Sequence, residues 1–145
     1  MQTQVFPYAN IVVGILIFIV GFILHWITQL ISLINWDFAT KIGLQEKKAL
    51  PEYKVYEHAI AVADVLIGWI YGIAAVGLIF NASWAYRLAW VPGVIMIYHS
   101  LSFWFWIGNQ NKSGHPTMSS TVRIVWFLAN FITGVLTVWV AWSAK

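Results

Sequence analysis

The chain has 145 residues, of which 61% are hydrophobic and only 9% carry a charge, with a formal net charge of +3. Soluble domains have about 25% charged residues, so this composition excludes an ordinary soluble enzyme and is typical of a polytopic membrane protein. The chain has no cysteine, which excludes disulfides, a thiolate nucleophile and cysteine-ligated iron–sulfur clusters. The small net charge gives no indication of nucleic-acid binding.

Four long apolar segments predict four membrane-spanning helices. A helix rises about 1.5 Å per residue, so roughly 20 apolar residues cross the hydrocarbon core of a bilayer. The expected spans are residues 10–34, 57–80, 87–107 and 120–142. Because the connections are short, consecutive spans should be antiparallel neighbours. We therefore expect a single all-α domain over residues 1–145, an integral membrane up-down-up-down four-helix bundle.

The positions of lysine and arginine predict how this bundle lies in the membrane. Positively charged residues are retained on the cytoplasmic side. The stretch 35–56 contains four lysines and the stretch 108–119 contains one, whereas the opposite side has only Arg87 and Lys145. We therefore expect the two loops, 35–56 and 108–119, in the cytoplasm and both termini outside. The expected host is the inner membrane of a cell.

Polar and small residues recur at helical spacing in each predicted span, and a face turned to lipid should instead be purely apolar. These stripes include His25, Asp64, His99 and Asn130, one from each span. Counted from the inner ends of the spans, both histidines lie roughly 12 Å deep, Asp64 roughly 9 Å and Asn130 roughly 13 Å. The four side chains are therefore expected to face one another inside the bundle.

Further polar and aromatic residues are predicted nearer the membrane surface. Glu57, Asn109 and Arg123 come close to the inner ends of their spans. Glu57 suits the start of a helix, and Arg123 could reach the interface. Trp106 and Trp126 fit an aromatic belt at the interface, or the walls of a pocket for a flat ligand. Because these groups gather on one side, the sequence predicts a polar cavity open to the cytoplasm rather than a through-pore.

Asp64 has two interpretations. As a structural residue it would form an ion pair with Arg123 or a hydrogen bond to His99, since a buried charge needs a partner. As a functional residue it would accept a proton or contact a ligand. A metal ion held by His25, Asp64 and His99 is chemically reasonable, but no ligand-spacing motif supports it, so no metal site is predicted.

The leading functional hypothesis is a binding or accessory membrane protein, because no catalytic motif is present. Besides the lipid bilayer, its expected partners are an amphipathic small molecule such as a lipid or quinone, other membrane subunits, or a second copy of itself. The residues expected to bind the ligand are Asp64, His99, Arg123, Asn130, Glu57, His25, Trp106, Asn109 and Trp126.

Two other functions stay open. His25 and His99 share a depth and could hold the iron of haem b from both sides, which would make the protein a haem- or quinone-linked electron-transfer subunit. Alternatively, Glu57 and Asp64 could act as acid and base in a small membrane enzyme or a proton-coupled carrier. The sequence does not identify a cofactor.

Overall fold

The computed structural model describes residues 5–45, 50–115 and 118–144. Within these ranges the structure is built from helices and contains no strand, which confirms the predicted all-α class. Three basic residues used to predict the orientation lie outside the described residues: Lys47, Lys48 and Lys145.

Three helices in the described part of the chain are long and apolar enough to cross a membrane. They are Ala9–Ile34, Ser83–Lys112 and Ser120–Ser143. A fourth candidate span consists of two helices, Pro51–Ile67 and Trp69–Ile79, which meet at an angle of 41°. The four predicted apolar segments thus correspond to three candidate spans and to one pair of helices that could form a broken span.

The first long helix has three consecutive segments, α1 (Ala9–Leu16), η1 (Ile17–Ile27) and α2 (Thr28–Ile34). Segment η1 is π-helical, a wide form that is rare in proteins and frequent at functional sites. The helix ends at Asn35, whose extended backbone turns the chain. The Asn35 side chain then accepts a hydrogen bond from the Phe38 N–H at 2.9 Å and caps the short helix α3 (Trp36–Lys41).

The second candidate span begins earlier than the predicted residue 57. Helix α4 (Pro51–Ile67) starts at Pro51, because proline has no N–H to leave unpaired in the first helical turn. Helix α5 (Trp69–Ile79) follows after Gly68. A Cβ atom on Gly68 would lie 2.6 Å from the Trp26 ring, so the glycine lets Trp26 pack into the bend. There the Trp26 Nε1–H donates to the Val65 carbonyl at 3.1 Å.

The third candidate span consists of α6 (Ser83–Leu88) and α7 (Trp90–Lys112), and the fourth is α8 (Ser120–Ser143). Helix α7 continues to Lys112, beyond the predicted end at residue 107, so the connection to α8 is shorter than expected. Helices α7 and α8 lie side by side. The absence of a side chain at Gly134 allows the close approach of these helices. A Cβ atom there would lie only 2.9 Å from the Gly93 carbonyl oxygen.

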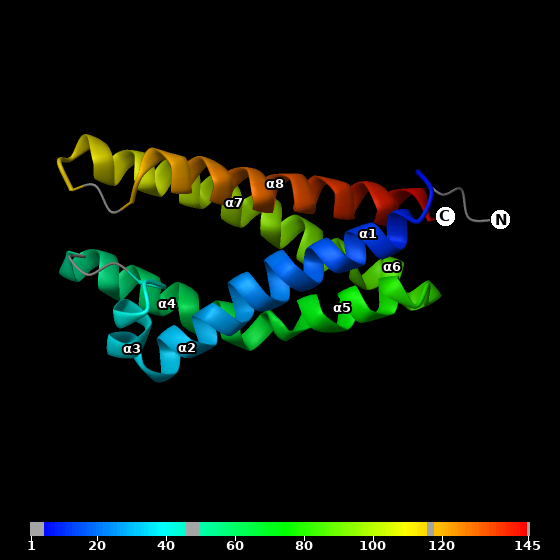
Figure 1. Cartoon of the computed structure of the whole chain (residues 1–145), viewed down its shortest axis with the longest axis horizontal. Coiled ribbons are helices and arrows are strands. Elements are labelled where there is room, and N and C mark those ends of the chain that lie inside the picture. The colour runs from blue at the N-terminus through cyan, green and yellow to red at the C-terminus, as the bar shows by residue number, and fades with distance from the viewer. Residues whose placement is uncertain (1–4, 46–49, 116–117, 145) are drawn as a thin grey trace.

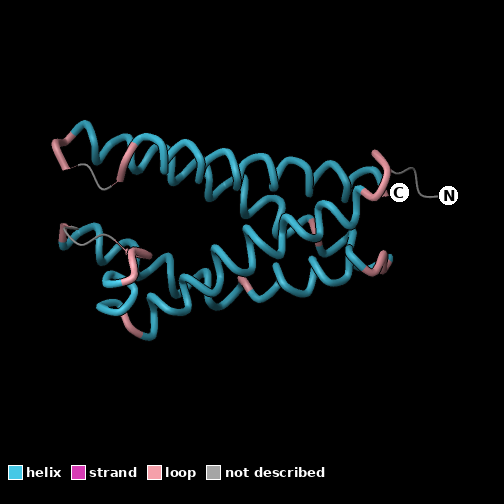
Figure 2. The backbone as a smooth tube through the Cα atoms, in the orientation of Figure 1, coloured by secondary structure: helices cyan, strands magenta, loops and turns pink. Residues whose placement is uncertain are grey.

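The helices form two layers that meet at one end of the molecule. Helix α8 lies along α7, and α5 lies along α1 and η1. Figure 1 shows these layers close together near both chain termini and diverging toward α3, the start of α4 and the α7–α8 connection, and Figure 2 shows the same divergence. The apolar core fills the closed end with small and aliphatic residues, among them Val13, Ile17, Ala75, Leu78, Ala85, Met96 and Val140.

Candidate ligand-binding cavity

A cavity of about 330 Å³ lies at the end of the molecule where the two layers diverge. Its walls come from the η1–α2 helix, the residues after α3, α4, α7 and the start of α8. Small-molecule sites are clefts of roughly 300–1,000 Å³ with mainly apolar walls and a few convergent polar groups. The cavity has the volume of a site for a small organic molecule.

Aromatic side chains form the wall of the cavity on the α4 and α7 sides. The Tyr56 and Trp106 rings stack with their centroids 4.5 Å apart, and Tyr53 lies near the same indole at 6.2 Å. Phe103 extends this wall along α7. The Trp106 Nε1 atom is buried and has no hydrogen-bond partner among the described residues. This wall therefore combines ring faces for stacking with one free N–H donor.

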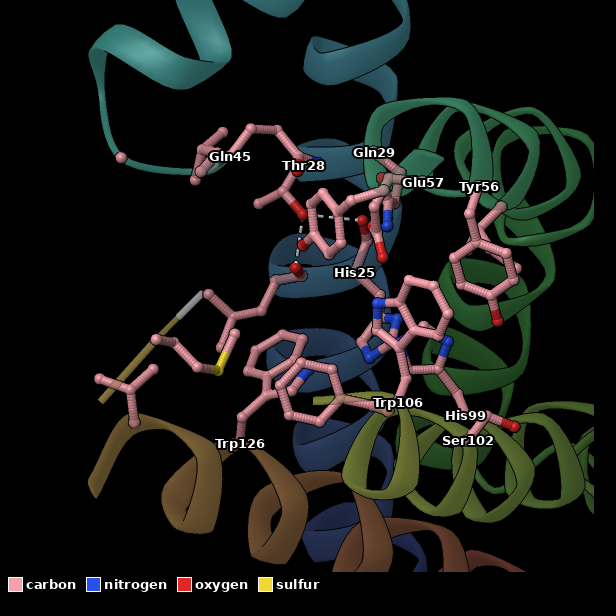
Figure 3. A pocket seen from close by; sticks show the side chains of 18 of the residues that line it. His25, Thr28, Gln29, Gln45, Tyr56, Glu57, His99, Ser102, Trp106 and Trp126 are labelled. Atoms are coloured by element: carbon pink, nitrogen blue, oxygen red, sulfur yellow. Dashed lines mark hydrogen bonds between the residues drawn. The ribbon is translucent and has the colours of Figure 1, made fainter. Parts of the chain in front are cut away.

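Two histidines close the inner end of the cavity. His25 from η1 is only 3% exposed, and its ring stacks on Trp126 of α8 with centroids 5.0 Å apart. The ring of His99 from α7 meets His25 edge to face at 4.4 Å. Figure 3 shows His25 and His99 together with Trp106 at the cavity. Because the two rings touch, a haem between them would require the histidines to separate.

Asn130 of α8 forms a hydrogen bond with His25. The amide is fully buried, and its Oδ1 lies 2.6 Å from His25 Nε2. The Asn130 Nδ2–H donates to the Trp126 carbonyl at 2.8 Å, which fixes the amide so that Oδ1 faces the histidine. An amide oxygen can only accept, so the His25 Nε2 atom carries the proton.

Asp64 lies beside the two histidines but just outside the cavity lining. One ligand atom each from His25, Asp64 and His99 lies within 4.8 Å of the other two. The Asp64 Oδ2 atom is buried and has no hydrogen-bond partner in the described part of the chain. The structural interpretation of Asp64 required an ion pair or a hydrogen bond, and this oxygen has neither.

Arg123 and Asn109 are predicted binding residues that, like Asp64 and Asn130, do not line the cavity. The Arg123 guanidinium donates to the Trp104 carbonyl at 2.5 Å and covers the Trp104 ring at 3.9 Å from its centroid. It lies against Gly108, where a Cβ would come within 2.7 Å of Nη2. Arg123 therefore joins α8 to α7 instead of facing Asp64.

The other predicted residues come together. His25, Glu57, His99, Trp106 and Trp126 all line the cavity. Glu57 stands toward the mouth with two polar residues from the α2 side, Thr28 and Gln29. Asn130 and Asp64 form a second layer behind the histidines.

The cavity is also lined by Tyr53, Tyr56 and Ile60, which are not among the predicted binding residues. With Glu57 they step by three, four and seven along α4, the spacing of one helix face. This signal is present in the sequence, but the predicted span began at residue 57 and left both tyrosines in a loop.

Comparison of the chain with protein-family models, with curated proteins and with solved structures gives no match. The assignment of this site rests on its own geometry.

Proposed function

We propose that this protein is an up-down-up-down four-helix membrane protein that binds an amphipathic small molecule in a cavity open to one side. The main support for this proposal is the cavity of about 330 Å³ with its aromatic wall and two groups of polar residues. The first group is the two histidines at the inner end, and the second is Glu57, Thr28 and Gln29 toward the mouth. This combination favours a ligand with a flat or aliphatic apolar body and polar atoms at its ends. A quinone or a single-chain lipid meets that description.

The outer faces of the helices support the membrane part of the proposal. Leu66 of α4 is 68% exposed, Phe105 of α7 is 66% exposed and Val125 of α8 is 61% exposed. Soluble proteins rarely leave contiguous large apolar side chains uncovered. Hydrocarbon chains of a bilayer would cover these faces at no cost in desolvation, because lipid tails are as apolar as leucine.

The described basic residues support a cytoplasmic mouth. Lys41 ends α3, Lys54 lies in the first turn of α4 and Lys112 ends α7, all at the end where the cavity lies. By the positive-inside rule this end faces the cytoplasm, and both termini lie outside a cell's inner membrane. In this orientation the ligand enters from the cytoplasmic side of the bilayer.

In the proposed complex the apolar body stacks on Tyr56 and Trp106, with Trp126 opposite. The free Trp106 Nε1–H donates to a carbonyl or ester oxygen, since a buried donor without a partner costs free energy. Glu57 and Gln29 receive the polar group nearer the mouth. The haem-linked and proton-coupled functions stay predictions, and no contact in the structure favours either over ligand binding.

A cavity-filling variant tests the proposal. Ile60 lines the cavity, so Ile60→Trp should occupy its volume, whereas Val62→Trp adds the same ring on the exposed side of α4. Binding is measured by quenching of tryptophan fluorescence with a decyl benzoquinone, and by native mass spectrometry with lysophosphatidylcholine. We expect saturable binding of at least one probe to the wild type and to Val62→Trp, and at least tenfold weaker binding to Ile60→Trp. Absence of saturable wild-type binding, or equal binding by all three proteins, would overturn the proposal.

A further inference from the structure

Three side chains of metal-ligating type converge behind the inner end of the cavity, each from a different helix. They are His25 of η1, Asp64 of α4 and His99 of α7, and their ligand atoms lie within 4.8 Å of one another. We propose that these three residues bind one divalent transition-metal ion. This inference does not depend on an amphipathic ligand.

The protonation of His25 favours metal binding. Its Nε2–H donates to Asn130, whose amide is held in that orientation by the Trp126 carbonyl. The lone pair of the ring is therefore on Nδ1. Histidines that bind metals usually donate their other N–H to a fixed acceptor, which sets the tautomer and the direction of the ring. Asn130 has the position of such a supporting residue.

Asp64 supplies the negative charge that the site needs. A buried carboxylate oxygen without a partner is costly, because it has lost its hydration and gained no hydrogen bond. The Asp64 Oδ2 atom is in this condition among the described residues. A cation bound between Asp64 and the histidines would compensate that oxygen directly.

The contact between the two histidines also favours metal binding. His25 and His99 meet edge to face at 4.4 Å, a distance at which two imidazoles can share one ion. Ligand atoms bound to one zinc ion at about 2.0–2.2 Å lie roughly 3–3.5 Å apart. The three ligand atoms, which now lie within 4.8 Å of one another, would draw closer together around a bound ion.

The donor set selects the class of ion. Two imidazole nitrogens and one carboxylate oxygen suit zinc and ferrous iron, whereas calcium and magnesium prefer oxygen ligands alone. Three protein ligands leave at least one coordination position for another molecule. His25 and His99 both line the cavity, so that position would face its interior. A molecule in the cavity would then reach the metal ion.

The first test uses the full chain, purified in detergent without a histidine tag and stripped of metal with a chelator. Co²⁺ is titrated as a coloured probe and is then displaced by Zn²⁺. We expect one Co²⁺ per chain, with intense visible ligand-field bands that Zn²⁺ removes. A spectrum identical to that of hydrated Co²⁺ would overturn the proposal without any variant being needed.

Variants then locate the bound ion. Asp64→Asn keeps the size of the side chain and removes its charge, and His99→Ala removes one nitrogen donor. Each should weaken Co²⁺ and Zn²⁺ binding at least tenfold. His58→Ala is the matched control, because His58 is exposed on the same helix as Asp64. Wild-type affinity in Asp64→Asn or His99→Ala, or an equal loss in His58→Ala, would contradict the site.

The Ile60→Trp variant separates this proposal from the proposed function. Ile60 lines the cavity and is not one of the three ligands. Ile60→Trp should bind Co²⁺ like the wild type while it loses the quinone or lipid probe. A protein that binds the probe but no metal ion would retain the proposed function and refute the metal site.

Discussion

The Nε2 atom of His25 on η1 lies 2.6 Å from the Oδ1 atom of Asn130 on α8. This buried hydrogen bond joins two helices through residues that are 105 positions apart in the chain. It fixes the ring that closes the inner end of the cavity. The bond therefore contributes both to the packing of the helices and to the geometry of the site.

Replacing Asn130 should lower both the stability of the protein and its affinity for a metal ion. Asn130→Leu keeps a similar volume but leaves the buried His25 N–H without an acceptor, which costs about 1–3 kcal/mol. Thermal unfolding in detergent, followed by circular dichroism, measures this loss. Loss of a residue that supports a metal ligand also lowers metal affinity by roughly 10–100-fold. Thr133→Val is the control, since the Thr133 hydroxyl donates to the Ala129 carbonyl of its own helix. Equal stability of the two variants would contradict this role of Asn130.

The bend at Gly68 should be sensitive to one added methyl group. Gly68→Ala would place a Cβ 2.6 Å from the Trp26 ring and 2.5 Å from the Asp64 carbonyl oxygen. Overpacking of this kind costs about 1–3 kcal/mol. Ala63→Val adds side-chain atoms at an exposed position of the same helix and should have little effect. The unfolding temperatures of the two variants measure this difference. A Gly68→Ala variant as stable as Ala63→Val would contradict the prediction.

The stacked pair of Tyr56 and Trp106 should contribute to ligand affinity. Tyr56→Ala removes a ring, 4.5 Å from Trp106, on which the probe is proposed to stack, and such an aromatic contact with the probe would contribute about 0.5–1.5 kcal/mol beyond the area it buries. We expect affinity for the quinone probe to fall by roughly 3–10-fold, as this energy implies. Tyr56→Phe keeps the ring and should bind like the wild type. A loss in Tyr56→Phe as large as in Tyr56→Ala would assign the effect to the hydroxyl.

Arg123 should affect stability and leave ligand binding unchanged. Its guanidinium bonds to the Trp104 carbonyl and covers the Trp104 ring, outside the cavity. Hydrogen bonds from a charged group contribute about 1.5–3 kcal/mol, so Arg123→Ala should lower the unfolding temperature. Probe affinity, measured on the folded variant, should equal that of the wild type. A large loss of affinity would instead support the ligand-binding role that the sequence predicted for Arg123.

Local patterns in the sequence determined the helices and the faces that carry the site. The apolar length of each segment predicts its helix, because hydropathy and the 1.5 Å rise are properties of the segment alone. The helical period also placed His25, Asp64, His99 and Asn130 on inward faces at similar depth, and the structure brings these four together.

Tertiary packing decided the pairings between helices. The sequence made Arg123 a candidate partner for Asp64, but the rotation of α8 against α7 turns Arg123 onto Trp104. The period of one helix shows which residues share a face, but not the angle at which that face meets a neighbour. That angle depends on contacts between helices, here the close approach at Gly134 and the bend at Gly68. The sequence of a single segment does not determine such contacts, because they involve a second segment.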